Sequence, residues 1–148
     1  MTLTLDSQLT LALLAHLVGD YLLQSDWMAS RKVAPGPNDT YGHAESWAAA
    51  LAHGITYTLP FLLITQHPLA LLVIGGTHVL IDHYRLAKRV IWLRNYLAPA
   101  GDNVPWQVAR TNQGMPPEVP TGMATALLIV ADNTLHLVIN AATLAATA

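Results

Sequence analysis

Histidine and aspartate recur four residues apart in three apolar segments of the chain. The three pairs are His16 with Asp20, His78 with Asp82, and Asp132 with His136. A further apolar segment contributes His53, while Gln24 and Arg85 follow the first two pairs at the next facing positions. Side chains at i and i+4 share one face of a helix, so the members of each pair would point the same way. Imidazole and carboxylate groups bind zinc and other first-row metals, so the pattern predicts a metal site.

The composition around these residues is that of a membrane protein. Of the 148 residues, 11% are charged and 53% are apolar, against about 25% charged in an average soluble domain. The mean hydropathy is +0.37, which excludes a disordered chain. A net charge of -2 argues against nucleic-acid binding. The absence of cysteine excludes disulfides, thiol chemistry and cysteine-ligated zinc.

Four apolar stretches would position the pairs, and each is close to the roughly 20 residues that cross a hydrocarbon core. We therefore predict an all-α polytopic membrane protein, a four-transmembrane-helix bundle in a single domain over residues 1–148. The predicted spans are 9–28, 44–65, 69–93 and 122–146. The two loops that carry basic residues are 29–43 and 94–121. The second loop holds five prolines and would suit a lid over the site.

The basic residues predict how these spans are oriented. All seven lysines and arginines fall at the same ends of the four spans, in or beside the two loops. The positive-inside rule therefore places both loops in the cytoplasm and both chain termini outside, in a bacterial inner membrane. Four tryptophans gather at the same face, as in an interfacial aromatic belt: Trp27, Trp47, Trp92 and Trp106.

The seven histidines and aspartates of the predicted site lie at a common depth in these spans. Counted from the cytoplasmic ends at about 1.5 Å per residue, they come about 8 to 15 residues in, or roughly 12–23 Å. An aspartate there costs roughly 2.5–3.5 kcal/mol on insertion scales, so it must be protonated, paired with a cation such as Arg85 or Lys88, or bound to a metal. Two metal-free alternatives stay open: a protonic network, and hydrogen bonds between helices worth roughly 0.6 kcal/mol each.

Three further histidines do not follow the pattern of pairs. His43 and His67 lie at loop edges, where water would solvate them. His83 directly follows Asp82, but it lies off the face that Asp82 shares with His78. We therefore expect all three to lie outside the site.

The arrangement of these residues resembles a known family. The run from His16 to Met28, followed by Lys32, is similar to the opening signature of the membrane family called domain of unknown function 3307. The later histidines and aspartates extend the resemblance over nearly the whole chain, and it is closest to phage-type members. This sequence departs from the family through an enlarged first loop, where 33–40 looks inserted. With Lys32 and Arg85 as secondary members, the resemblance implies a functional set of His16, Asp20, Gln24, His53, His78, Asp82, Asp132 and His136.

The leading hypothesis is a membrane-embedded, metal-dependent hydrolase that acts on a lipid or lipid-linked substrate. The predicted ligands of a divalent ion, with zinc first and manganese or iron as alternatives, are His16, Asp20, His53, His78, Asp82, Asp132 and His136. A metal-activated water would be the nucleophile. The predicted catalytic residues are Asp20, Asp82, Gln24 and Arg85, with Arg85 binding a phosphate or a developing negative charge.

Two other classes of function compete with this hypothesis. The chain could be a small oligomeric transporter or channel in which the histidines and aspartates conduct protons or a metal ion. It could also be a non-catalytic phage or host membrane factor that binds a partner protein through the second loop. The expected partners are membrane lipids, a lipid-linked substrate and further copies of the chain, with no nucleic acid.

Overall fold

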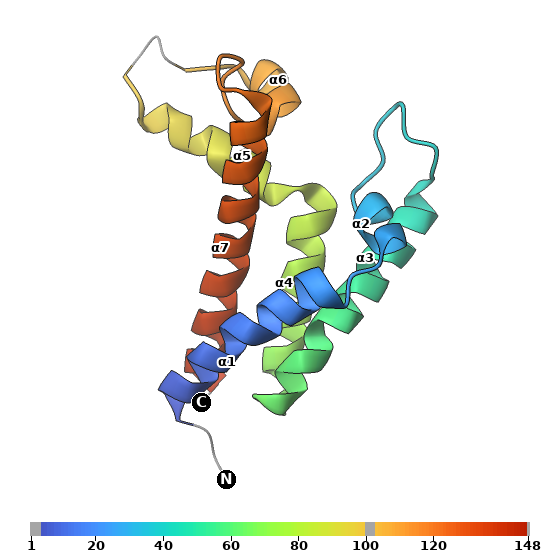
Figure 1. The fold of residues 1–148 in the computed structure, drawn as a ribbon, viewed down its shortest axis with the longest axis vertical. Helices are drawn as coiled ribbons and strands as arrows, with labels where there is room; N and C mark the ends of the chain where they lie inside the picture. The colour runs from blue at the N-terminus through green and yellow to red at the C-terminus, as the bar shows by residue number, and fades with distance from the viewer. Residues whose placement is uncertain (1–3, 100–102, 148) are drawn as a thin grey trace. The chain divides into compact units, whose positions relative to one another are not determined.

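The computed structural model describes residues 4–99 and 103–147, and over these residues the chain is all-α, without a strand. Figure 1 shows the helices in chain order. The α-helices are α1 (Leu5–Leu17), α2 (Asp26–Arg31), α3 (His43–Thr58), α4 (Pro68–Tyr84), α5 (Leu86–Arg94), α6 (Trp106–Ala109) and α7 (Thr121–Thr147). Four short turns of π- or 3₁₀-helix join them: η1 (Val18–Leu22), η2 (Leu59–Leu63), η3 (Asn95–Leu97) and η4 (Arg110–Asn112).

The prediction of an all-α protein is confirmed, but a bundle of four continuous spans is not supported. Among the described residues, α7 is the one helix that is long and apolar enough to cross a membrane, with a mean hydropathy of 1.5. Each of the other three predicted spans is interrupted. The predicted outward placement of the chain termini concerns residues 1–3 and 148, which lie outside the described residues, as do 100–102 of the second loop.

Each interruption has a local cause. Within the predicted span 9–28, the α-helix changes to a π-helical turn at Val18. This turn ends at Leu22, and the separate helix α2 begins at Asp26. Span 44–65 tightens into the 3₁₀ turn η2 at Pro60, because proline has no N–H to continue the α-helical ladder. Span 69–93 breaks at Arg85, whose backbone is left-handed with a φ of 48°.

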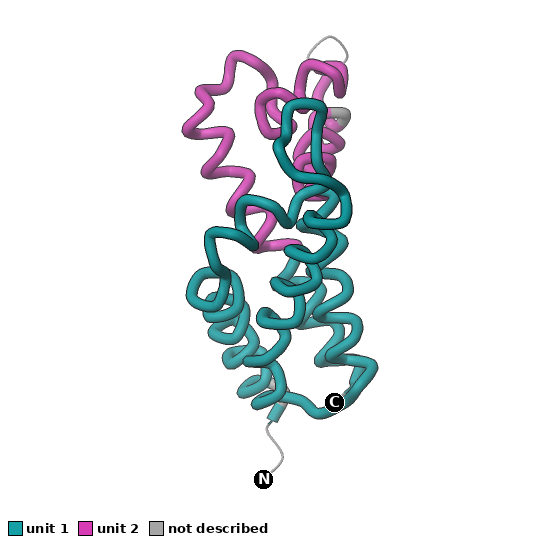
Figure 2. Tube along the Cα trace, turned by 90° about the vertical axis from the view of Figure 1, so that its right-hand side faces the viewer, with its two compact units in different colours: residues 1–84, 136–148 teal, residues 85–135 magenta. Residues whose placement is uncertain are grey.

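The described chain forms two compact units, coloured separately in Figure 2. Unit 1 comprises residues 1–84 and 136–148, and unit 2 comprises residues 85–135. Helix α7 therefore supplies its first half to unit 2 and its second half, from His136 onward, to unit 1. The single domain predicted from the sequence did not include this division into two units.

Unit 1 contains an apolar core beside its polar residues. The core is formed by Ala12, Ala15, Tyr57, Phe61, Ile64, Ile74 and Leu144. The π-helical turn packs closely on it at Gly19, where a Cβ atom would lie 2.7 Å from Tyr57 Cδ2 and 3.0 Å from Tyr57 Cα. Glycine at this position therefore lets η1 approach α3 and brings the neighbouring Asp20 toward that helix.

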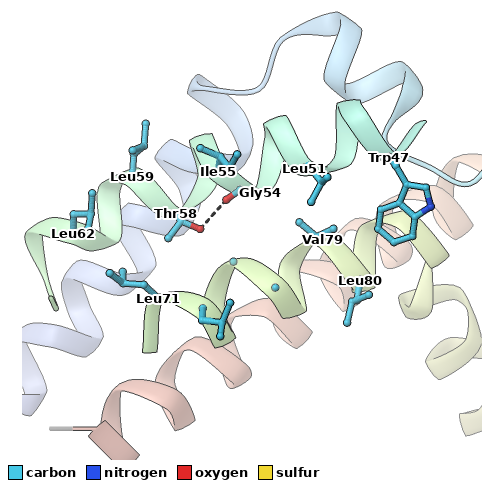
Figure 3. Close-up of a pocket in the computed structure, with 13 residues that line it drawn as sticks. Trp47, Leu51, Gly54, Ile55, Thr58, Leu59, Leu62, Leu71, Val79 and Leu80 are labelled. Carbon is cyan, nitrogen blue, oxygen red and sulfur yellow. Dashed lines mark hydrogen bonds between the residues drawn. The ribbon is translucent and has the colours of Figure 1, made fainter. Parts of the chain in front are cut away.

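Helices α3 and α4 form a closely packed hairpin in unit 1. A Cβ atom at Gly54 would overlap the Val79 side chain, and one at Gly75 would overlap the Thr58 hydroxyl, so both glycines allow the close approach. Alongside runs an apolar groove of about 610 Å³. Thr58 turns its hydroxyl inward and donates to the Gly54 carbonyl at 2.7 Å (Figure 3), so the groove wall is almost entirely hydrocarbon.

Unit 2 is held by short-range packing around α5. An apolar cluster of Ile91, Met115 and Ala124 forms its core. The predicted loop 94–121 is ordered where it is described, because the Trp92 indole N–H donates to the Val104 carbonyl at 2.8 Å and the Trp92 ring packs on Trp106. The described part of this loop contains the short helices η3, α6 and η4, and its role as a lid stays a prediction.

Candidate metal centre

Four ligand atoms converge inside unit 1. Asp20 comes from η1, His53 from α3, and the pair His78 and Asp82 from successive turns of α4. His53 Nε2 lies 2.9 Å from His78 Nε2 and 3.1 Å from Asp20 Oδ1. His78 Nε2 lies 3.3 Å from Asp20 Oδ1 and 3.2 Å from Asp82 Oδ2. All four residues offer an atom within 4.8 Å of the others, so together they could hold a metal ion.

The spacing of these four atoms suits the ligands of a single metal ion. A metal with bonds of about 2.0–2.1 Å to nitrogen and oxygen needs ligand atoms separated by about 3.3 Å. The five separations between these atoms that involve a histidine run from 2.9 to 3.4 Å. Two imidazoles and two carboxylates are a donor set that zinc accepts, and manganese and iron accept it too. The residues present therefore fit a divalent ion.

His136 contacts two of these ligand residues, and it determines which ring nitrogen of His78 carries the proton. Its Nε2 lies 3.3 Å from Asp82 Oδ1, and its Nδ1 lies 3.2 Å from His78 Nδ1. A carboxylate only accepts, so in neutral rings His136 donates through Nε2–H and must accept through Nδ1. His78 then donates through Nδ1–H, which leaves the lone pair of its Nε2 facing the other ligand atoms. Outer partners of this kind orient metal-binding histidines and raise their basicity.

His16 lies on the other side of the centre, next to Asp20. Its Nδ1 is 3.6 Å from Asp20 Oδ2 and 3.0 Å from the Tyr57 hydroxyl. The Tyr57 oxygen in turn accepts from Asn140 Nδ2 at 2.7 Å. His16 and His136, both predicted as ligands, thus contact the carboxylates of the centre from outside. In these positions they would orient Asp20 and Asp82, and their predicted roles as ligands stay predictions.

Lys32 is the functional residue that the spacing of pairs did not identify. Its Nζ lies 2.6 Å from Asp82 Oδ2, in an ion pair whose side chains are 16% and 4% exposed. With its amide oriented to satisfy both ends, Gln24 accepts from Lys32 Nζ at 2.9 Å and donates to the Asp20 carbonyl at 3.3 Å. The family signature, which includes Lys32, was the one signal for it. The inserted residues 33–40 do not keep Lys32 from the centre.

His83 anchors the segment that carries Lys32. Its Nδ1–H donates to the Lys32 carbonyl at 2.9 Å, and its own carbonyl accepts from the Ala34 N–H at 2.9 Å. The ring is fully buried and stacks on Trp47 with 3.9 Å between centroids. His83 thus contacts the backbone of the segment that carries Lys32, without contacting a ligand atom itself. The His83 side chain lies off the helix face that carries His78 and Asp82, because it faces the first loop.

The two other predicted site residues belong to unit 2. Asp132 is half-buried on the first half of α7, one turn before His136. Arg85 is exposed at the break between α4 and α5. Their roles as ligand and as anion-binding residue stay predictions.

The fold and the centre define a class of helical protein with a largely buried histidine and aspartate cluster built from three separate segments, η1, α3 and α4. A model described as "Protein of unknown function (DUF3307)" matches residues 8–147, and the chain therefore belongs to this family. No curated protein and no solved structure matches the chain.

Proposed function

We propose that this chain is a membrane-embedded metal-dependent hydrolase that acts on a lipid or lipid-linked substrate. The observation that carries the proposal is the convergence of His53 Nε2, His78 Nε2 and the Asp20 and Asp82 carboxylates at separations of about 3 Å. A bound divalent ion would supply an activated water at neutral pH. The chain has no cysteine to serve as a nucleophile, so a water is the simpler choice.

The distribution of exposed and buried side chains supports membrane embedding. Apolar side chains cover the outside of unit 1, including Leu22 at 75%, Leu63 at 85% and Leu72 at 70% exposed. The histidines of the cluster are at most 1% exposed. A soluble protein rarely exposes so much apolar surface, and charged groups inside a membrane face the protein interior. In this proposal α1 with η1, α3 with η2, and α4 join α7 in the hydrocarbon region.

The groove beside α3 and α4 supports a lipid as the substrate. Its wall combines leucines and valine with glycines that leave space, and a Cβ atom at Gly76 would meet nothing within 4 Å. A volume of about 610 Å³ lies in the range of ligand pockets, which is about 300–1,000 Å³. We also propose that the protein lies in a bacterial inner membrane with its two loops in the cytoplasm. We further propose that several copies of the chain assemble.

The residues of the centre would divide the chemical work. His53 and His78 would hold the ion, because their Nε2 atoms face each other and the carboxylates. Either Asp20 or Asp82 would act as general base toward the water while the other binds the ion. Gln24 and Lys32 border the carboxylates and would orient them.

A metal-free proton pathway is the second candidate function. The contacts His53–His78, His78–His136 and His136–Asp82 form a continuous hydrogen-bonded series through unit 1. Linked imidazoles and carboxylates of this kind serve as proton relays in membrane transporters. A single protomer offers little room for a pore, so this function would require assembly of several copies.

Metal content tests the two candidates directly. The full chain would be purified in detergent, dialysed against zinc, manganese or iron, and analysed by mass spectrometry for bound metal. We expect one tightly bound ion per chain, lost in both His53→Ala and His78→Ala. His67→Ala, which changes an exposed histidine, is the matched control and should keep the ion. Wild-type protein without metal would overturn the hydrolase and favour the proton pathway.

A further inference from the structure

The ammonium group of Lys32 borders the four ligand atoms. It lies 2.6 Å from Asp82 Oδ2, the same oxygen that lies 3.2 Å from His78 Nε2 and 3.4 Å from His53 Nε2. The Gln24 amide oxygen supplies its second contact, at 2.9 Å. The cation is therefore oriented toward the centre, and one carboxylate oxygen faces both the ammonium and the ligand histidines.

Charge balance around Asp82 changes when a metal binds. Asp20, Asp82 and Lys32 sum to -1 with neutral imidazoles, and a divalent ion brings this sum to +1. A divalent ion on Asp82 Oδ2 is then the larger local charge, and it weakens the attraction of that oxygen for the ammonium. Counted over the residues of unit 1 at the centre, a bound divalent ion would therefore leave one positive charge to be balanced, near Lys32.

The backbone contacts of Lys32 keep its ammonium close to the centre. The Lys32 carbonyl is bound by His83 Nδ1–H, and the Ala34 N–H is bound by the His83 carbonyl. The His83 ring is in turn held in place because it stacks on Trp47. Because the backbone is held on both sides of Val33, the Lys32 side chain can reorient only within its own length.

We propose that Lys32 binds an anionic oxygen of the substrate, and that the substrate is a phosphate ester. This inference rests on the proposed metal function and specifies its substrate class. A lysine beside a divalent ion is an arrangement that clamps a phosphoryl group and stabilises charge developing on its oxygens. A neutral carboxylic ester or amide carries no negative charge to balance the positive charge of the metal-loaded centre. It is therefore a less suitable substrate than a phosphate ester.

Phosphate binding to the zinc-loaded full chain in detergent tests the proposal. Isothermal titration calorimetry would use two probes, inorganic phosphate and dihexanoyl phosphatidic acid, in a detergent without phosphate. We expect binding to zinc-loaded wild type and none to the metal-free chain. Lys32→Met should keep its zinc and lose at least tenfold in phosphate affinity, whereas Lys32→Arg should retain most of it.

Arg31→Met is the matched control, because Arg31 is the neighbouring basic residue and pairs with Glu45 at the surface at 2.7 Å. Its phosphate affinity should equal that of wild type. Tighter binding of phosphatidic acid than of phosphate would assign the site to a lipid headgroup, and equal binding would assign it to a free phosphate ester. Both of these results support the proposal.

Three results would overturn the phosphate-ester assignment. The first is zinc-loaded wild type that binds neither probe, and the second is Lys32→Met with unchanged phosphate affinity. The third is loss of zinc from Lys32→Met, which would make Lys32 a structural support of the centre. A wild-type chain that binds no zinc overturns the proposed function itself, so the two failures are distinguishable.

Discussion

The two compact units of this chain bury different kinds of side chain. Unit 1 buries histidines and aspartates next to an apolar core and leaves its large leucines exposed. Unit 2 buries Ile91, Met115 and Ala124 and fastens its loop with tryptophan contacts. Unit 1 therefore holds its candidate metal site at a cost in polar burial, while unit 2 is stabilised by ordinary apolar packing.

The two units also differ in how far apart in the sequence their contacting residues lie. The contacts between helices in the centre of unit 1 join residues 25 to 58 positions apart, as in His53–His78 and His78–His136. In unit 2, Trp92 bonds Val104, which is 12 positions away. Changes at the centre of unit 1 should therefore disturb metal binding and stability together, whereas changes in the apolar packing of unit 2 should disturb stability alone.

The largest expected effect is that of Asp82→Ala in metal-free protein. The change removes the counter-ion of Lys32 and the acceptor of His136 Nε2–H, which leaves a largely buried cation without its partner. We expect the free energy of unfolding to fall by about 3 kcal/mol, measured by SDS-induced unfolding of the detergent-solubilised chain. Asp26→Ala, at the exposed start of α2, should cost about 1 kcal/mol or less. Equal losses would contradict the coupling of polar burial to stability.

His136→Ala should weaken metal binding without abolishing it. The change removes the acceptor of His78 Nδ1–H and the donor to Asp82, so two ligands lose their orientation. We expect the zinc dissociation constant to rise about 10–100-fold, as measured by competition with a chelating dye. Thr134→Ala alters an exposed residue of the same helix and is the control. Complete loss of zinc would instead place His136 among the direct ligands.

Gly114→Ala tests whether unit 2 is independent of the centre. Gly114 has a φ of 88°, and a Cβ atom there would overlap the Lys88 carbonyl oxygen. We expect a loss of about 1–3 kcal/mol in stability from the strained backbone, with zinc content unchanged. Gly122→Ala is the control, because a Cβ atom there meets nothing within 4 Å. Loss of zinc from Gly114→Ala would contradict the separation of the two units.

The smallest expected effect is a pH dependence from Lys88 in unit 2. Partial burial, with the nearby Arg85 guanidinium, lowers the pKa of Lys88 to about 8. The unfolded chain then binds more protons than the native one between pH 8 and about 10.4, so stability should rise with pH across this window. Lys88→Met should remove this rise, measured as the difference in melting temperature between pH 7.5 and 9.5. An identical pH dependence in both proteins would contradict the assignment.

Much of the candidate site could be predicted from residue spacing. The i, i+4 pairs placed His78 with Asp82, and the low charge of the chain marked these residues as exceptional. The helical class followed from the apolar runs. The breaks at Val18 and Arg85 were not predicted, because sequence hydropathy does not register a π-turn or a left-handed residue.

The sequence by itself determined that the chain is helical, that it carries histidine and aspartate pairs on helix faces, and that it resembles its family. The tertiary structure alone decided that Asp20, His53, His78 and Asp82 converge, and that His16 contacts Asp20 and His136 contacts Asp82. It also decided that Lys32 reaches Asp82 through an anchor at His83. Helical periodicity specifies the face that a residue shares, whereas the offset between helices depends on packing contacts such as Gly19 on Tyr57.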